Sequence, residues 1–237
     1  MASPVEQFAI QNLSPPLFSI GGSEIAVTNS AVFMIAAVAL SSVLLLAGAS
    51  KGAMIPGRLQ AMSELFYEFI ANMIRDNVGA AGKKFFPFIF TLFIFTLFGN
   101  VLGLLPYGFT FTSHIAVTFF MALVVFLAVT LIGIYKHGLH FFSLFFPHGA
   151  PLFTAPILIP IEIVSYLSRP ISLSVRLFAN MTVGHVLLKV LAGFVVALGI
   201  FGVVPLAVLV AITALELLIA LLQAYIFTIL CCIYLND

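Results

Sequence analysis

Two long stretches of the chain carry no charged side chain. Neither residues 25–50 nor residues 85–135 contain Asp, Glu, Lys or Arg. An α-helix needs about 20 apolar residues to cross a bilayer, so the second stretch is long enough for two crossings and a turn. Charged residues make up only 7% of the whole chain, whereas a soluble domain carries roughly a quarter. The sequence therefore predicts an all-α integral membrane protein.

Pro, Gly and charged residues divide the apolar sequence into about five transmembrane helices within a single membrane domain, 1–237. An N-terminal segment, 1–28, precedes predicted spans at 29–49, 87–105, 114–135, 152–191 and 195–235. Each of the last two spans would be about 60 Å long as a helix, which is twice the hydrocarbon thickness of about 30 Å. We expect them to lie strongly tilted as a hairpin, or to be broken at Pro160, Pro170 and Pro205.

Residues 58–78 predict a helix of a different kind. Apolar residues recur at helical spacing along one side, and Glu64, Glu68 and Arg75 are among the polar residues on the other. Because these charges are too many for a membrane crossing, the amphipathic helix is expected to lie in the interface. A soluble helix docked on a partner is the alternative interpretation. The apolar positions are Leu59, Met62, Leu65, Phe66, Phe69, Ile70 and Met73.

The basic residues indicate the orientation of the chain in the membrane. Arg58, Arg75, Lys83 and Lys84 all fall between the first and second spans, whereas the turn at 106–113 has no basic residue. Basic residues favour the inner side of a membrane, so the N-terminus is predicted outside and the C-terminus inside. The N-terminus also lacks the basic region of a signal peptide or a transit peptide.

Composition and motifs exclude several classes of function. A formal net charge of +1 gives no electrostatic footprint for nucleic acid. The sequence has no Gly-rich phosphate loop, catalytic triad or zinc motif, so we expect no nucleotide site, no cofactor, no metal and no enzyme activity by the chain alone. His137, His140 and His148 have no acidic residue or thiol near them in sequence, and they do not form a metal-binding pattern.

Polar residues inside the first long span are costly in lipid and therefore indicate a pathway. On an ideal helix a set of them falls within about 80° of one another. These residues are Glu162, Ser165, Arg169, Ser172, Arg176 and Asn180. Glu162 and Arg176 are about 21 Å apart along the axis, too far for a direct ion pair. We interpret the stripe as the wall of an aqueous cavity with a fixed cation at its inner end. A purely structural polar network is the alternative.

A second polar set contains titratable groups. Glu216 and Gln223 lie two turns apart on one face of the last span, and a histidine such as His185 exchanges protons near neutral pH. His185 lies about 180° around its helix from Arg176, so it belongs to a different compartment from the Glu162 stripe. Because an Arg guanidinium stays protonated, Arg176 blocks a direct proton leak. Two titratable sets on opposite sides of a fixed cation suit two offset half-channels serving a carboxylate on a moving partner.

Two runs of sequence resemble a known family. Residues 168–181 (SRPISLSVRLFANM) and 215–227 (LELLIALLQAYIF) resemble the paired motifs of subunit a of the F-type ATP synthase. Chain length and the order of segments match as well, so the resemblance covers nearly the whole chain. It implies a proton-translocating stator subunit of the Fo sector in an energy-coupling inner membrane. A bacterial cell inner membrane is expected because transit features are absent, with the mitochondrial inner membrane as the alternative.

The resemblance also implies partners and residue roles. The partners are the ring of c subunits (the c-ring), the peripheral stalk of subunit b, the remaining synthase subunits, the lipid bilayer and protons. Arg176 matches the family's essential arginine, which faces the c-ring carboxylate. In the family, the outer half-channel is matched by Asn180, His185, Glu216 and Gln223. The inner half-channel is matched by Glu162 and Ser165. The polar stripe on the same helix adds Arg169 and Ser172 to the inner set. His185 with Glu216 resembles the mitochondrial and alphaproteobacterial version. Near Asn100, where some relatives have an acid, this chain has none.

Two other functions compete with this one. A secondary transporter usually shows inverted repeats with broken helices at corresponding positions, but here both long segments lie at one end of the chain. A membrane-embedded hydrolase needs a nucleophile with a base, or a metal cluster, and neither pattern stands out in the sequence. The energy scale favours a rotary machine, since one proton crossing 100 mV releases about 2.3 kcal/mol and several must be collected to form ATP.

Overall fold

The computed structural model describes residues 8–13, 15, 18–20, 23–49, 52, 55–105, 108–138 and 155–236. Its α-helices are α1 (Asn29–Ala49), α2 (Arg58–Asn77), α3 (Phe86–Gly103), α4 (Ile115–His137), α5 (Ala155–Leu198) and α6 (Val203–Asn236). Shorter 3-10 turns are η2 (Ala80–Phe85), η3 (Phe111–Ser113) and η6 (Gly199–Gly202). A two-stranded antiparallel hairpin, β1 (Phe18–Ile20) and β2 (Ser23–Ile25), precedes α1. Five helices in the described ranges are long and apolar enough to cross a membrane, which confirms the predicted all-α integral membrane fold.

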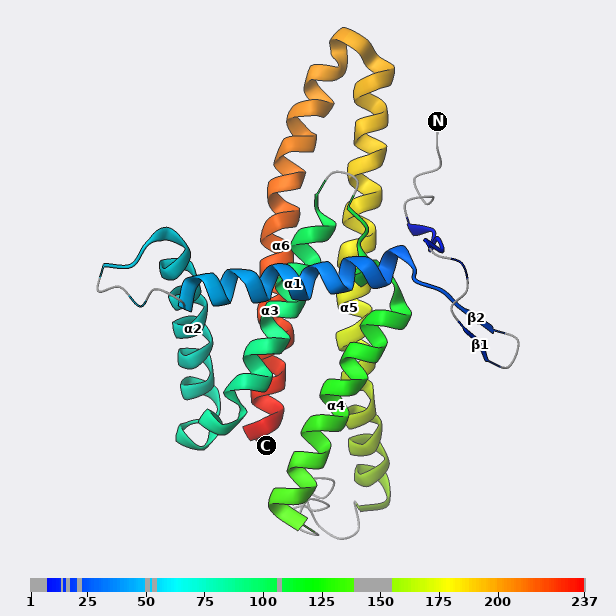
Figure 1. The fold of residues 1–237 in the computed structure, drawn as a ribbon. Coiled ribbons are helices and arrows are strands. Elements are labelled where there is room, and N and C mark those ends of the chain that lie inside the picture. The colour runs from blue at the N-terminus through cyan, green and yellow to red at the C-terminus, as the bar shows by residue number, and fades with distance from the viewer. Residues whose placement is uncertain are drawn as a thin grey trace.

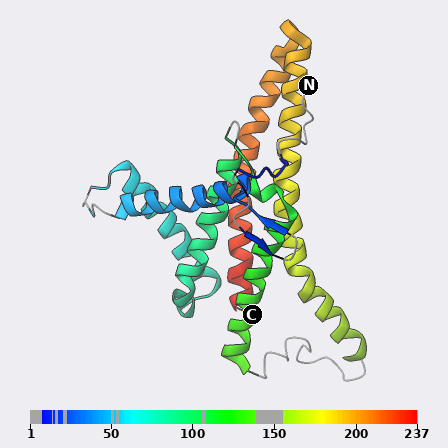
Figure 2. The same ribbon diagram turned by 45° about the vertical axis from the view of Figure 1, so that its right-hand side comes forward.

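Helix α1 lies across the hairpin that α5 and α6 form. Figures 1 and 2 show α5 and α6 side by side along the long axis of the molecule, with α1 running across that axis. The 21 residues of α1 make about 31 Å of helix, which matches the hydrocarbon thickness when the helix stands upright. A bilayer that α1 crosses upright is therefore crossed obliquely by α5 and α6. The 44 residues of α5 span about 66 Å and fit only in such a tilted orientation.

The prolines do not break the long helices. Helix α5 continues through Pro160 and Pro170, and Pro205 lies in the first turn of α6, where proline removes no helical hydrogen bond. Of the two alternatives for the long segments, tilt and not breakage describes this chain. The turn between them lies later than predicted, because α5 passes through Gly193 and ends before Gly199. Gly199 has a φ of 56°, a conformation that glycine adopts readily after a helix.

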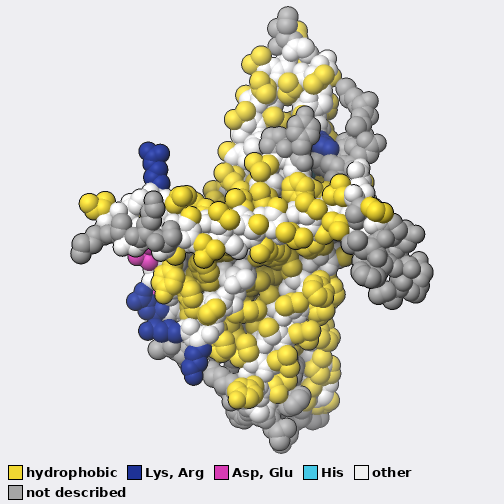
Figure 3. Space-filling view, viewed as in Figure 1, with side chains coloured by type: hydrophobic (Ala, Val, Ile, Leu, Met, Phe, Trp, Pro, Cys, Tyr) yellow, Lys and Arg dark blue, Asp and Glu magenta, His cyan; other side chains and the backbone are white. Residues whose placement is uncertain are grey.

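The amphipathic segment forms α2, which packs against α1, α3 and α6. Ile70, Met73 and Ile74 of this helix are buried, whereas Leu59 and Leu65 remain exposed. Part of the apolar side thus belongs to the core, and part stays exposed. Figure 3 shows Lys and Arg side chains gathered along the edge of the molecule at α2 and its junction with α3, beside a largely hydrophobic surface.

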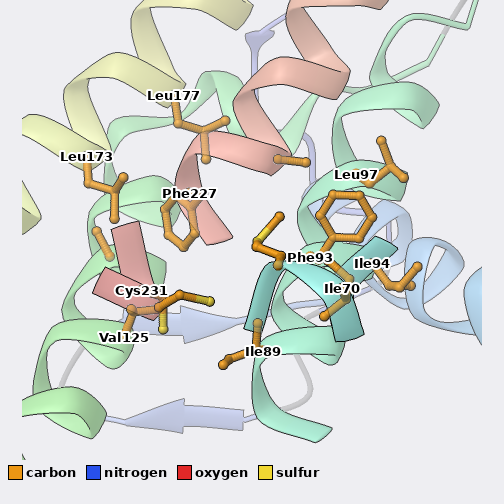
Figure 4. Packing of buried hydrophobic residues seen from close by; sticks show 14 of the residues in the cluster. Ile70, Ile89, Phe93, Ile94, Leu97, Val125, Leu173, Leu177, Phe227 and Cys231 are labelled. Carbon is orange, nitrogen blue, oxygen red and sulfur yellow. The ribbon is translucent and has the colours of Figure 1, made fainter. Parts of the chain in front are cut away.

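A hydrophobic core between α2, α3, α4, α5 and α6 fixes the position of the long helices. Figure 4 shows Leu173 and Leu177 of α5 and Phe227 of α6 on one side of this core, with Phe93 of α3 and Ile70 of α2 opposite them. Interiors packed in this way resist shifts of a helix along its axis. The core therefore sets the register in which the polar residues of α5 meet those of α6.

Candidate functional site along the seam between α5 and α6

Polar side chains of α5 and α6 meet at a seam between the two helices. The Asn180 Nδ2 donates to Gln223 Oε1 at 3.0 Å, and Gln223 is almost completely buried. Since the two helices run in opposite directions, residues after Asn180 face residues before Gln223. Gly184 accordingly lies against the carboxylate of Glu216, and a Cβ added at Gly184 would collide with that carboxylate. The packing thus places four polar or small residues in one line along the seam.

Glu216 is the most unusual residue of the seam. Its side chain is 6% exposed, and neither carboxylate oxygen has a hydrogen-bond partner within the described part of the chain. Asn100 of α3 donates through Nδ2 to the carbonyl oxygen of Ala220, one turn from Glu216, at 3.5 Å. Among the same residues, Asn100 Oδ1 and Gln223 Nε2 also lack partners. Burying polar groups without partners costs free energy, and such groups cluster at functional sites.

His185 follows Gly184 and faces η3. Its Nε2 lies 2.9 Å from Thr110 Oγ1, and the Thr110 hydroxyl donates to the carbonyl oxygen of Gly103 at 3.2 Å. A hydroxyl has one proton to donate, so when Thr110 donates to Gly103 its oxygen can only accept from His185. Thr110 therefore holds the imidazole in place, and the direction of their hydrogen bond follows the tautomer of His185.

A cavity of about 850 Å³ reaches His185, and we call it the His185 cavity. Lys189, one turn further along α5, also lines it, together with Thr213 of α6 and with Gln11 and Asn29 from the N-terminal region. A cavity of this size with several polar lining groups accommodates water. The geometry therefore gives His185 access to a solvated space on one side and, through its neighbour Gly184, proximity to Glu216 on the other.

Arg176 lies one helical turn before Asn180 and is exposed. The surface around it is mixed: Ser172 and Asn180, one turn away on either side along the same face, are also exposed, and so are several large apolar side chains of α5 and α6. These apolar side chains are Ile171, Val175, Val183, Leu218 and Leu222. A permanent cation on a partly apolar membrane surface is costly unless another group faces it. The arrangement calls for a partner that carries a negative charge.

The predicted inner residues lie on the other half of α5. Glu162 and Arg169 are half-buried, whereas Ser165 and Ser172 are exposed. The Arg169 guanidinium carbon lies 5.1 Å from the centroid of the Tyr166 ring, within the range of a cation–π interaction. The structure therefore brings Asn180, Glu216 and Gln223 to the seam, with His185 next to Gly184 in the chain. It leaves Ser165 and Ser172 exposed and Glu162 and Arg169 half-buried.

Some residues of the site escaped sequence reasoning. Gly184 has no side chain to give a signal, and its importance appears only when α6 is packed against it. Thr110 lies in an apolar turn, where a threonine usually bonds to its own backbone. Ser174 of α5 and Thr118 of α4 form a hydrogen bond between the two helices, with their hydroxyl oxygens 3.1 Å apart. No signal in the sequence pointed to this contact either.

The structure offers no metal-binding cluster among the residues it describes, since no group of three or more His, Cys, Asp or Glu side chains converges there. The side chains of His137, His140 and His148 lie outside the described set.

Comparison with known proteins decides the family. Residues 30–236 match the family described as ATP synthase A chain. This chain belongs to that family. ATP synthase subunit a of Rhodospirillum rubrum is 61% identical over 240 residues, covering 100% of this chain and 98% of the relative. The subunit a of Paramagnetospirillum magneticum is 59% identical over 244 residues, with 100% and 98% covered. That of Mesorhizobium japonicum is 53% identical over 241 residues, with 99% and 95% covered.

Family membership confirms the predicted resemblance. As a member of the ATP synthase A chain family, the protein is a proton-translocating membrane subunit of the Fo sector and works with the other subunits of an F-type ATP synthase. The bacterial relatives and the five apolar helices support a multi-pass inner-membrane protein. The transporter and hydrolase alternatives give way to this assignment.

Proposed function

We propose that this chain forms two offset half-channels that load and unload the carboxylates of a rotating c-ring, with Arg176 as the barrier between them. The observation that carries the proposal is the surroundings of Glu216. This buried carboxylate lies against Gly184, the residue before His185, on the same pair of helices as the Asn180–Gln223 hydrogen bond, and it lacks a hydrogen-bond partner among the described residues. Such a group is suited to accept and release a proton.

The outer half-channel follows the seam in four steps. Protons enter the His185 cavity and are taken up by the imidazole, whose second ring nitrogen can accept a proton. They pass to Glu216, and the Asn180–Gln223 pair then carries the hydrogen-bonded path to within one turn of Arg176. Asn and Gln amides both donate and accept hydrogen bonds, so they orient water along the path without becoming charged.

Arg176 separates the two half-channels because it cannot lose its proton. Its position on an exposed, partly apolar surface suits a partner helix that brings a carboxylate past it. A c-ring carboxylate facing Arg176 is held unprotonated, so it must give up its proton to one half-channel before passing and take up a proton from the other afterwards. A direct proton jump between the half-channels is repelled by the fixed positive charge.

The inner half-channel uses Glu162, Ser165, Arg169 and Ser172. Ser165 and Ser172 are exposed on α5, and Glu162 and Arg169 are half-buried; the c-ring is proposed to cover that side and enclose the water there. Glu162 then receives protons released from the ring, while Ser165 and Ser172 offer hydroxyl groups to ordered water. Arg169, held over Tyr166, supplies a fixed positive charge on the same side of the helix.

The proposed orientation has the N-terminus outside and the C-terminus inside. The basic residues at α2 and η2, gathered at one edge in Figure 3, favour the inner face, where α2 lies in the interface. The chain is proposed to act as a single membrane domain without a nucleotide site. Subunit b of the peripheral stalk and the remaining synthase subunits complete the assembly.

The decisive experiment substitutes Arg176→Ala in the assembled complex, reconstituted in vesicles. We expect loss of proton-driven ATP synthesis, with the complex still assembled, and a passive proton leak through the membrane sector. Arg75→Ala, which removes an exposed arginine of α2, outside the two helices of the seam, is the matched control and should keep both coupling and low leak. Coupled synthesis retained by the Arg176→Ala complex would rule out Arg176 as the barrier.

A further inference from the structure

A short N-terminal segment, residues 8–13, lies against the His185 cavity, and we call it the strap. Ala9 and Gln11 of the strap line this cavity. The ring of Phe8 stands edge-on to the ring of His185, with centroids 6.5 Å apart. The strap therefore forms part of the cavity wall at the point where the cavity reaches His185.

The strap is held by the side chain of Asn29, at the start of α1. Asn29 Nδ2 donates to the carbonyl oxygen of Ala9 at 3.1 Å, and Asn29 Oδ1 accepts from the backbone N–H of Gln11 at 3.3 Å. The backbone N–H of Asn29 donates to the carbonyl oxygen of Gln11 at 3.1 Å. An amide side chain combines a donor and an acceptor, so the Asn29 side chain hydrogen-bonds to two backbone groups of the strap.

The start of α1 has a cap of its own that does not use the strap contacts. Thr28 Oγ1 accepts from the backbone N–H of Ala31 at 3.3 Å, which satisfies one of the free amide groups at a helix N-terminus. Asn29 Oδ1 also accepts from the backbone N–H of Ser30 at 2.9 Å, and an aspartate at this position would retain this bond. The donation from Nδ2 to Ala9 is thus the contact that distinguishes strap binding from helix capping.

We propose that Asn29 is a positioning residue that holds the strap as a wall of the His185 cavity, and that this wall restricts access to His185 to small species such as water and hydronium. This inference adds to the proposed proton path. Only the identity of the species that passes the wall depends on that path. The wall itself rests on the contacts of Asn29, Phe8, Ala9 and Gln11, and it can be tested without proton transport.

The test measures thiol accessibility inside the cavity of the assembled complex in vesicles. Leu188, a half-buried lining residue on α5, is replaced by cysteine, and the buried Cys231 and Cys232 give a low background in the chain without this change. A small methanethiosulfonate reagent should label the introduced thiol readily, whereas a maleimide attached to a long polyethylene glycol chain should react slowly. Adding Asn29→Leu should raise the rate with the bulky reagent about tenfold, because the strap loses side-chain hydrogen bonds.

Two further variants keep the outcome interpretable. Asn29→Asp retains the acceptor oxygens and the helix start but cannot donate to Ala9, so its labelling rate should fall between those of the unchanged strap and the Asn29→Leu variant. Asn12→Ala alters an exposed strap side chain whose backbone pairs with Thr28, and it should leave the rate unchanged. If Asn29→Leu prevents assembly, Asn29→Asp carries the test alone.

The proposal would be overturned if the bulky maleimide labelled the introduced thiol at the same rate in the chain with Asn29 and in the Asn29→Asp and Asn29→Leu variants. Rapid labelling by the bulky maleimide in the chain with an intact strap would overturn it as well. Neither result touches the role of Arg176. Conversely, coupled synthesis in the Arg176→Ala complex would refute the proposed half-channels while leaving the labelling result, and hence the strap, intact.

Discussion

The two halves of α5 carry polar residues in very different surroundings. Around Asn180 and Gly184 the polar groups meet α6, and their neighbours come from the same chain. We call this the enclosed half. Around Glu162 and Ser172, in the open half, they lie on a helix surface that the described chain leaves largely uncovered. The enclosed half is therefore a site that this chain builds alone, whereas the open half is completed only when another subunit covers it.

This contrast has an energetic basis. Polar groups exposed to hydrocarbon cost several kcal/mol, so an open polar surface in a membrane protein indicates an interface with protein or water. An enclosed carboxylate without a partner costs free energy as well, but the rest of the chain stabilises it by packing. We therefore expect substitutions in the enclosed half to disturb proton transfer directly, and substitutions in the open half to depend on the partner.

Replacing Glu216 with Gln should give the largest effect in the enclosed half. The amide keeps the size of the side chain but cannot carry a proton, so proton-driven ATP synthesis in vesicles should fall by about a hundredfold or more. Glu162→Gln is the matched substitution in the open half and should lower synthesis less than about tenfold, because water can reach a half-buried position and replace the carboxylate there. Equal losses in the two variants would remove the distinction between the halves.

Gly184→Ala should have the next largest effect. The added methyl group would meet the Glu216 carboxylate, and because that is the end of a flexible side chain, the carboxylate should move while the fold persists. Displacing a reacting group by about 1 Å can lower a rate by up to about a hundredfold, so we expect a loss between tenfold and a hundredfold in synthesis with normal assembly. Gly193→Ala on the same helix, where nothing lies near the new methyl group, should be neutral. A silent Gly184→Ala would show that the seam tolerates movement.

The Asn180–Gln223 hydrogen bond should contribute a smaller amount. Removing either partner leaves a polar group of the seam unsatisfied, and we expect Gln223→Leu to lower synthesis by about tenfold. A double-mutant cycle with Asn180→Ala measures the interaction, since residues in contact have effects that do not add. Additive losses in the assembled complex would mean that the two side chains act separately.

The sequence was sufficient to predict the fold class and the residue types of the site. Charged residues are so rare that Glu216 and Arg176 stand out in their apolar segments without any structural knowledge. Periodicity also placed Glu162 and Arg176 on one side of a helix. Gly184, Thr110 and Asn29 could not be found in this way, because their roles depend on contacts between segments far apart in sequence. The position of the turn after α5 was missed for a related reason, since Gly193 and Gly199 differ only in the backbone conformation that packing imposes.

Tyr166→Phe should give the smallest effect, and it tests the open half from its buried side. The Tyr166 hydroxyl lies 2.7 Å from Thr130 Oγ1 of α4, so the substitution removes a hydrogen bond worth about 0.5–1.5 kcal/mol. The aromatic ring that lies against Arg169 is retained. We therefore expect a small decrease in the thermal stability of the assembled complex and nearly unchanged ATP synthesis. A large loss of synthesis would mean that this hydroxyl takes part in proton release, and the open half of α5 would then contain a site built by the chain itself, as the enclosed half does.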